Sequence, residues 1–210
     1  MPDSASVLLA IDLQNDFMPG GALAVAGGDE VVPLVNRLAQ AFGHVVLTQD
    51  WHPAGHVSFA ANHPGCQPFE TIALPYGEQT LWPVHCVQGS RGAALHEGLH
   101  AAAARARAIV RKGQNPALDS YSAFLEADRK TPTGLAGYLR ELGVRRMFCC
   151  GLATDYCVAW SALDARAAGF EAALIEDASR AINLNGSLDA AWRQLRAAGV
   201  ARISAQEALG

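Results

Sequence analysis

Reactive side chains follow predicted strands at several points of the 210-residue sequence, either directly or after a short loop. The residues concerned are Asp12, Asp50, His52, Lys112 and Cys157. In open α/β sheets, ligands bind beyond the carboxyl ends of the parallel strands. We therefore expect these five side chains to converge on one edge of a sheet, where they would offer a thiol, a cation, two acids and an imidazole.

Cys157 is the candidate nucleophile. It lies in the first turn of a helix predicted from about 155 to 168, with Thr154 or Asp155 as the N-cap. Unpaired N–H groups at a helix start stabilise a thiolate, which predicts a lowered pKa for this thiol. The N–H groups of the preceding loop could also bind an oxyanion. Cys149 and Cys150 lie inside the preceding strand, and we interpret them as buried structural thiols.

A thiol nucleophile needs a group that accepts its proton and a charge that orients it. No histidine follows a predicted strand in a position suited to a general base. Asp12 can accept the thiol proton, and Lys112 can stabilise the negative charge of both groups. An isolated aspartate at a strand end often caps a loop, and an isolated lysine usually lies on the surface. The hypothesis therefore depends on the three residues together.

A second group of side chains has the composition of a metal site. Asp50 and His52 lie two residues apart at a strand end, and His85 could return from the following segment as a third ligand. One carboxylate and two or three imidazoles suit Zn²⁺, Fe²⁺ or Mn²⁺. His56 is a candidate fourth ligand, and His63 is a weaker one.

Short apolar runs alternate with helical patterns along the whole chain. The predicted strands cover 7–11, 44–48, 108–110, 147–151, 172–175 and 202–203, and the predicted helices cover 30–42, 135–142, 155–168 and 188–198. Strands that are apolar on both faces indicate a parallel α/β sheet covered by helices, and the length fits a single domain, 1–210. A stretch at about 51–107 is rich in Pro, Gly and His and shows little periodicity, which favours a functional segment.

Composition excludes several other classes of protein. A net charge of −4 argues against a nucleic-acid or anionic-membrane partner. No run of about 18 apolar residues is present, and no signal peptide is visible. The five cysteines form no CxxC pair, which suits free thiols in a reducing compartment, so we expect a cytoplasmic protein.

Taken together and in order, these motifs resemble the nicotinamidase/pyrazinamidase family within the isochorismatase-like hydrolases. The matching stretches run nearly from end to end of the chain. They are 10–17 (AIDLQNDF), 19–23 (PGGAL), 48–53 (TQDWHP), 58–60 (SFA), 81–88 (LWPVHCVQ), 111–116 (RKGQNP), 119–124 (DSYSAF) and 151–158 (GLATDYCV).

The resemblance implies a six-stranded parallel sheet with helices on both faces, and a role for each matching residue. It implies a catalytic triad of Asp12, Lys112 and Cys157. It implies an oxyanion hole from the N–H groups of Ala153 and Cys157, with an unusual cis peptide before Ala153. The implied metal ligands are Asp50, His52 and His85 with waters, and His56 is a candidate addition. The implied ring pocket consists of Phe17, Leu23, Trp82 and Tyr121.

The activity implied by the resemblance is hydrolysis of nicotinamide to nicotinate and ammonia through a cysteine thioester, with pyrazinamide as a further substrate. This activity serves NAD salvage and pyridine nucleotide biosynthesis. It requires one divalent ion, Zn²⁺ or Fe²⁺ with Mn²⁺ as an alternative, in a monomer or homo-oligomer. Three other interpretations stay open. The first is another amidohydrolase of this superfamily that acts on a different small amide, such as an N-carbamoyl amine. The others are a non-enzymatic module on the same scaffold and a zinc hydrolase with an inert Cys157.

Overall fold

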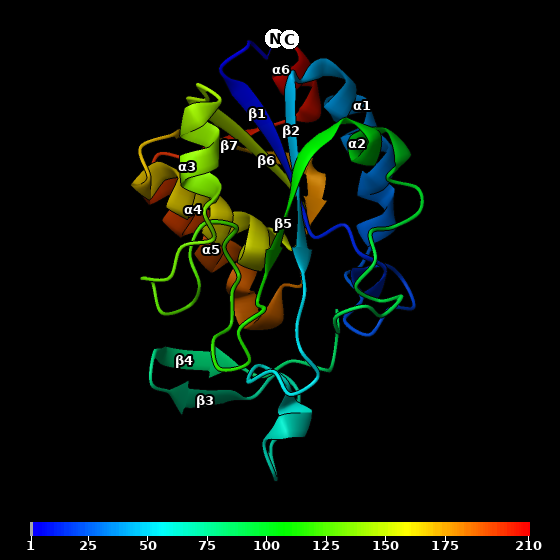
Figure 1. Ribbon diagram of the computed structural model, residues 1–210, viewed down its shortest axis with the longest axis vertical. Coiled ribbons are helices and arrows are strands. Elements are labelled where there is room, and N and C mark those ends of the chain that lie inside the picture. Colours follow the sequence, from blue (N-terminus) through cyan, green and yellow to red (C-terminus); the bar gives the residue numbers. More distant parts are fainter. Residues whose placement is uncertain (1) are drawn as a thin grey trace.

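Six parallel strands form the centre of the computed structural model, which describes residues 2–210 (Figure 1). Their order across the sheet is β5-β2-β1-β6-β7-β8. The strands are β1 (Ser6–Ile11), β2 (His44–Asp50), β5 (Ala106–Lys112), β6 (Arg146–Leu152), β7 (Glu171–Arg180) and β8 (Ala201–Ile203). The predicted α/β class and the six-stranded parallel sheet are therefore confirmed, although most strands extend beyond the predicted apolar runs.

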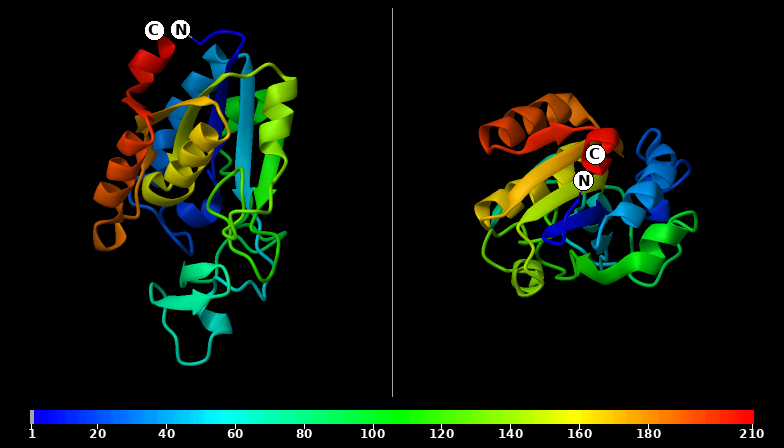
Figure 2. Two further views of the ribbon diagram at one scale, coloured as in Figure 1. Left: turned by 90° about the vertical axis from the view of Figure 1, so that its left-hand side faces the viewer. Right: turned by 90° about the horizontal axis from the view of Figure 1, so that it is seen from above.

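The sheet is apolar on both faces because helices cover both. Along β1, Leu8 and Ala10 face a core shared with α1 (Val32–Ala41), α2 (His100–Arg105) and α6 (Ala205–Leu209). The alternate residues Val7, Leu9 and Ile11 face a second core, shared with α3 (Leu135–Glu141), α4 (Ala159–Ala167) and α5 (Ser187–Ala197). Figures 1 and 2 show these two helical layers on either side of the sheet. Burying each large aliphatic side chain contributes about 1.5–3 kcal/mol, so both layers stabilise the fold.

The segment between β2 and β5 contains more regular structure than its sequence predicts. An antiparallel hairpin of β3 (Thr71–Leu74) and β4 (Gly77–Thr80) forms a small separate sheet beyond the carboxyl ends of the main strands (Figure 1). The hairpin strands have four residues each, and β4 is polar, so the pair lacks the long apolar runs by which most of the main strands were recognised. The helix α2 also lies in this segment, and α6 is a second helix that was not predicted.

Two predicted helices begin differently from the expectation. The helix expected at 30–42 starts with a 3-10 turn at Gly28–Val31 and continues as α1. The helix expected at 155–168 starts with a π-helical turn at Thr154–Val158 and continues as α4. Short 3-10 turns also occur at Asn15–Phe17, Ala60–Asn62 and Leu184–Gly186.

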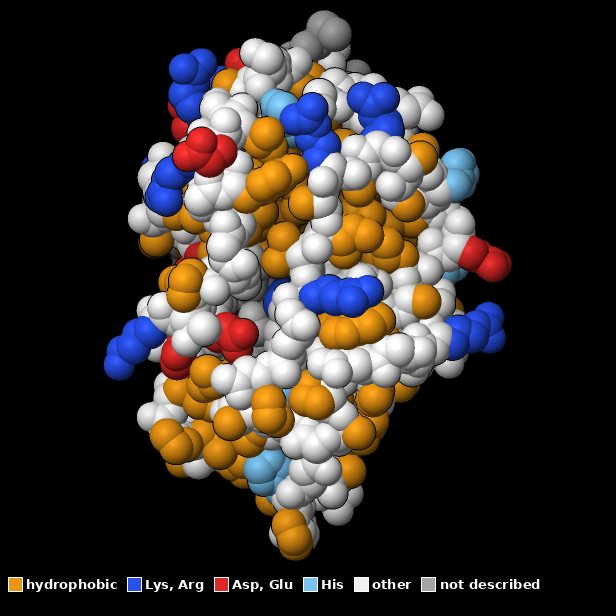
Figure 3. Space-filling model, in the orientation of Figure 1, with side chains coloured by type: hydrophobic (Ala, Val, Ile, Leu, Met, Phe, Trp, Pro, Cys, Tyr) orange, Lys and Arg blue, Asp and Glu red, His pale blue; other side chains and the backbone are white. Residues whose placement is uncertain are grey.

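The surface carries mixed side chains. In the orientation of Figure 3, Lys and Arg side chains are scattered singly among acidic, polar and apolar ones. Within residues 2–210, none of the helices combines the length and the apolar character that crossing a membrane requires.

Candidate active site

The carboxyl ends of four neighbouring strands bring the predicted reactive side chains together. Asp12 directly follows β1, Asp50 ends β2, Lys112 ends β5, and Cys157 follows β6. Asp50 and Lys112 are register partners in the pairing of β2 with β5. The convergence at one edge of the sheet that the sequence predicts is therefore what the fold produces.

Lys112 lies at the centre of this group. Its Nζ is 2.9 Å from Asp12 Oδ2 and 3.3 Å from Cys157 Sγ, and it also donates to Asp50 Oδ1. One carboxylate oxygen each of Asp12 and Asp50 lies within 4.8 Å of the Cys157 sulfur. All four side chains are buried. One cation thus pairs with two carboxylates and contacts the thiol.

Asp12 is held so that one oxygen stays available. Its Oδ1 accepts a hydrogen bond from Thr48 Oγ1 at 2.5 Å, and the same hydroxyl accepts from the Asp12 N–H at 3.1 Å. Its Oδ2 lies 2.9 Å from Lys112 Nζ and has no other partner. A carboxylate oxygen has two lone pairs, so this buried oxygen can also accept a proton from a neighbouring group.

Burial is the largest single influence on the pKa values of Cys157, Asp12 and Lys112. It raises the pKa of the Cys157 thiol well above its ordinary value, although the Lys112 charge opposes the shift. It also raises the pKa of Asp12, again against the effect of Lys112. The pKa of Lys112 lies well above its usual value because Asp12 and Asp50 outweigh burial. The expectation of a lowered thiol pKa is therefore wrong, since desolvation outweighs the influence of the helix start.

The turn that carries Cys157 has an unusual backbone. The Leu152–Ala153 peptide bond is cis, as the resemblance implies. The predicted capping by Thr154 or Asp155 is wrong, because Ala153 is the N-cap and no side chain caps the turn. A Cβ at Gly151 would lie 2.1 Å from the Ile11 carbonyl oxygen, so only glycine lets β6 approach β1 this closely here.

Asp50, His52 and His85 form a second cluster beside the first. Nδ1 of His52 donates to the Gly113 carbonyl at 2.9 Å, and Nδ1 of His85 donates to the Pro83 carbonyl at 2.8 Å. Each ring therefore turns its Nε2 toward Asp50 Oδ2, at 3.7 and 3.8 Å. These distances exceed hydrogen-bond range, so the two Nε2 atoms and Asp50 Oδ2 face a common point without forming hydrogen bonds to one another. This arrangement fits a divalent metal ion.

Neighbouring residues fix the position of the cluster. The side chain of Gln14 accepts from the Asp50 N–H and donates to the Asp50 carbonyl, both at 2.8 Å. A Cβ at Gly113, whose φ is +65°, would lie 2.3 Å from Cε1 of His52. The absence of a side chain at Gly113 therefore makes room for the imidazole.

The candidate fourth ligand lies behind this cluster. His56 stacks on His52 with ring centroids 4.2 Å apart, and its two nitrogens bond to Ser58 Oγ and the Leu118 carbonyl. Burial, together with the charge of His52, lowers the pKa of His56 to about 4. Because both nitrogens already have protein partners, His56 does not face Asp50 as the other two imidazoles do. His63 likewise bonds to the Val57 carbonyl at 2.7 Å.

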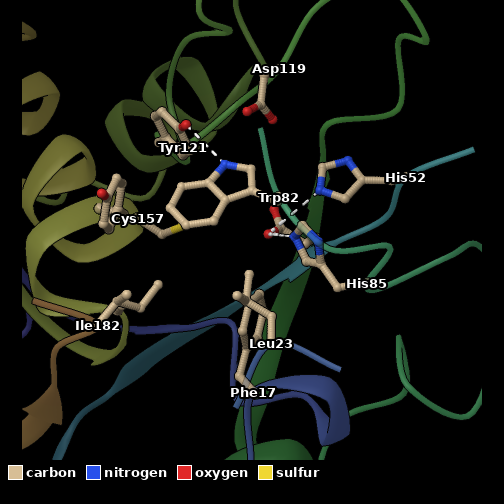
Figure 4. Close-up of a pocket in the computed structure, with 12 residues that line it drawn as sticks. Phe17, Leu23, His52, Trp82, His85, Asp119, Tyr121, Cys157 and Ile182 are labelled. Atoms are coloured by element: carbon tan, nitrogen blue, oxygen red, sulfur yellow. Dashed lines mark hydrogen bonds and ion pairs between the residues drawn. The ribbon is translucent and has the colours of Figure 1, made fainter. Parts of the chain in front are cut away.

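A pocket connects the two clusters (Figure 4). Cys157 lies at one end, and His52 and His85 lie at the other. The four residues expected to line a ring pocket all line this one: Phe17, Leu23, Trp82 and Tyr121. Trp82 Nε1 donates to the Tyr121 hydroxyl at 3.1 Å, which fixes both aromatic rings in one wall.

The sequence interpretation missed three further lining residues, Asp119, Tyr156 and Ile182. Asp119 and Tyr156 belong to two of the matching motifs, 119–124 and 151–158, so their place in those motifs was an available signal. Ile182 carries no such signal, because β7 continues five residues beyond the predicted strand and places Ile182 just after its end. Gln79 of the hairpin was missed as well. Its Nε2 donates to Asp119 Oδ2 at 2.7 Å, which ties the hairpin to the pocket.

The comparisons with known proteins agree with one another on the family of this chain. The model of the isochorismatase domain matches residues 6–207. The curated nicotinamidase of Acinetobacter baylyi is 54% identical over 202 residues, which cover 96% of this chain and 94% of the relative. A nicotinamidase/pyrazinamidase structure from Acinetobacter baumanii has a TM-score of 0.96 at 54% identity, with 98% of each chain covered. A Pyrococcus horikoshii pyrazinamidase in complex with zinc has a TM-score of 0.74 at 35% identity, covering 95% of this chain and 99% of that one.

Proposed function

This chain belongs to the isochorismatase family and hydrolyses nicotinamide to nicotinate and ammonia, and we propose that Cys157, Asp12 and Lys112 carry out this reaction. The observation that carries the proposal is the contact of Lys112 Nζ with both the Cys157 sulfur, at 3.3 Å, and Asp12 Oδ2, at 2.9 Å. A nucleophile, a base and a cation in mutual contact are the groups that amide hydrolysis through a thioester requires.

Acylation begins with proton transfer. The thiol of Cys157 is neutral at rest because burial raises its pKa, and Asp12 Oδ2 is free to accept its proton. The sulfur then forms a bond to the carboxamide carbon, and the carbonyl π-electrons move to the oxygen. Collapse of this intermediate breaks the C–N bond. Asp12 gives its proton to the departing nitrogen, so ammonia leaves and a thioester remains.

Deacylation repeats the same proton movements with water. Asp12 accepts a proton from the attacking water, whose oxygen bonds to the thioester carbon. The C–S bond breaks, and the proton on Asp12 restores the Cys157 thiol. The product leaves as the acid, which gives its proton to the solvent and becomes nicotinate. Lys112 stays positively charged throughout, because Asp12 and Asp50 hold its pKa well above the usual value. The backbone N–H groups of Ala153 and Cys157 are the proposed donors to the oxyanion in both halves.

We propose that Asp50, His52 and His85 hold a divalent metal ion, Zn²⁺ or Fe²⁺ with Mn²⁺ as an alternative. The support is the orientation of their donor atoms, together with the likeness to a zinc-bound pyrazinamidase. When bound, the ion supplies a Lewis acid for the ring nitrogen of the substrate. The chain contributes the orientation of the two imidazoles, because their Nδ1–H groups donate to the carbonyls of Gly113 and Pro83 and leave Nε2 for the ion.

The pocket residues explain the preference for an aromatic amide. We propose that Phe17, Leu23, Trp82 and Tyr121 contact the ring, because they form apolar and aromatic walls between Cys157 and the histidines (Figure 4). Pyrazinamide offers the same carboxamide on a similar ring, so it is a substrate as well. Because nicotinate is a precursor of pyridine nucleotides, we assign the reaction to NAD salvage.

Ammonia release from nicotinamide tests the proposal directly. The wild-type protein should release one ammonia for each nicotinate formed, and Cys157→Ala should release none while it keeps the fold and the metal content. Cys66→Ala is the matched control, because Cys66 is a half-buried thiol in the segment after the Ala60–Asn62 turn. Measurable turnover by Cys157→Ala would show that the reaction does not pass through this sulfur.

A further inference from the structure

Asp155 has an unassigned role two residues before Cys157. Its side chain is 6% exposed and bonds to the segment that follows β7. It accepts hydrogen bonds from the Ile182 N–H at 3.0 Å, from the Asn183 N–H at 2.7 Å and from the Ser187 hydroxyl. One buried carboxylate thus joins the turn of the candidate nucleophile to a segment almost thirty residues later in the chain.

The segment that Asp155 holds turns through two left-handed residues. Asn183 and Asn185 have φ values of 56° and 50°, in a region that asparagine adopts more readily than other non-glycine residues. The N–H groups of Ile182 and Asn183 donate to the Asp155 carboxylate at the start of this turn. A side chain from the nucleophile turn therefore restrains the position of the segment.

Ile182 connects the position of this segment to the shape of the substrate pocket. Its side chain lines the pocket, and Figure 4 shows it on the same side of the pocket as Cys157. Tyr156, the residue after Asp155, lines the pocket as well. The distance between the reacting sulfur and the Ile182 wall is therefore set through Asp155.

We propose that Asp155 is a positioning residue that fixes the Ile182 wall against the Cys157 turn and so determines which ring substituents the pocket accepts. The inference rests on the proposed nicotinamidase function and adds a determinant of its specificity. The walls formed by Phe17, Leu23, Trp82 and Tyr121 come from other elements, so a change at Asp155 should widen the pocket on the Ile182 side only.

The test uses nicotinamide and a set of nicotinamides that carry one methyl group on each free ring carbon in turn. Ile182→Ala removes the wall directly, so the analogue whose kcat/KM rises most relative to nicotinamide identifies the ring position that faces Ile182. Asp155→Asn keeps the size of the side chain but places an NH₂ group where an oxygen accepted hydrogen bonds. One backbone N–H of the loop then lacks its acceptor, and the loop relaxes.

Asp155→Asn should favour the same methylated analogue as Ile182→Ala. We expect the ratio of kcat/KM for that analogue to kcat/KM for nicotinamide to rise about tenfold, which is the discrimination that one methyl group supplies in an apolar pocket. The fall in kcat/KM with nicotinamide itself should come mainly from a raised KM. Asp189→Asn is the matched control, because Asp189 is an exposed acid in the first turn of α5, and its ratio should equal that of the wild type.

A purely structural role predicts a different result. In that case Asp155→Asn would lower the activity toward every analogue by the same factor. That factor would equal the fall in the amount of Cys157 that an alkylating reagent can titrate. This result would overturn the proposal. If Asp155→Asn does not fold, Ser187→Ala removes a single donor and decides the question. A smaller shift toward the same analogue supports the proposal, and an unchanged ratio overturns it. Failure of the wild type to hydrolyse nicotinamide would instead overturn the proposed function.

Discussion

The Nζ atom of Lys112 lies 3.3 Å from the sulfur of Cys157, yet the thiol has a raised pKa. Burial is the larger effect, and the single positive charge of Lys112 is already shared with Asp12 and Asp50. The resting site is therefore a neutral thiol beside one cation that two acids share. Under the proposed roles, the sulfur becomes a nucleophile when Asp12 accepts its proton, so the site would work by coupled proton transfer and not by storing a thiolate.

Lys112→Met should destabilise the fold and abolish activity, because it leaves two buried carboxylates without their cation. Removing one partner of a buried ion pair costs about 3–5 kcal/mol, which should appear as a clear fall in the thermal midpoint. Lys130→Met is the control, since Lys130 is exposed, and it should leave both the midpoint and the activity unchanged. A wild-type midpoint for Lys112→Met would mean that the cation does not stabilise these acids.

The pH profile of kcat/KM should have an acid limb above the ordinary range of an aspartic acid. Asp12 can act as a base only when it is deprotonated, and burial raises its pKa above the usual 3.8. The activity is therefore present above this raised pKa and is lost as the pH falls through it. Circular dichroism at each pH separates this loss from unfolding. An acid limb at or below 3.8 in the folded protein would contradict the assignment of Asp12 as the base.

Removal of the metal should affect nicotinamide far more than benzamide, which has the same carboxamide but no ring nitrogen. The candidate acyl-transfer groups lie in the chain itself, so the ion is needed to orient the ring, and orientation is worth several kcal/mol. Benzamide should be a very poor substrate with or without chelator. Equal inhibition of both amides by a chelator would indicate instead that the ion activates water or stabilises the surrounding loops.

Gly113→Ala should weaken metal binding. The added methyl group would lie 2.3 Å from Cε1 of His52, and the φ of +65° adds backbone strain. Gly143→Ala is a matched control, because Gly143 has a φ of +72° but no atom within 4 Å of the added methyl group. Both variants should lose some stability, but only Gly113→Ala should lose bound metal, measured by elemental analysis. Full metal content in Gly113→Ala would show that His52 tolerates displacement.

The sequence predicts those parts of the site that depend on strand ends. Asp12 and Asp50 follow apolar runs that are buried on both faces, and Lys112 ends the neighbouring edge strand, so the parallel sheet aligns the three strand ends. Gln79 was not predicted, because it lies on a short polar strand and its partner Asp119 comes forty residues later in the chain. The pKa of Cys157 was predicted in the wrong direction, since a local helix start can be read from sequence but the depth of burial cannot.

Asp155 illustrates a different limit. Its position in the sequence suits a helix cap, and the cap is a local interaction that a motif can suggest. In the structure its partners are Ile182, Asn183 and Ser187, which come almost thirty residues later or more. No pattern within the motif encodes that choice, because it depends on how the residues after β7 return to the nucleophile turn.

The pairing of Asp50 with Lys112 also brings together the two ends of one long segment that carries part of the pocket. The segment 51–105 leaves the sheet after β2 and returns to the adjacent strand β5, so its two ends are already neighbours in the core. Within it lie His52, His85 and Trp82, whereas Asp12, Lys112 and Cys157 lie outside it. An insertion or exchange in this segment can therefore alter the two candidate metal-binding histidines and the Trp82 wall without changing the three proposed catalytic residues. The other walls of the pocket, at Phe17, Leu23, Tyr121 and Ile182, would keep their sequence.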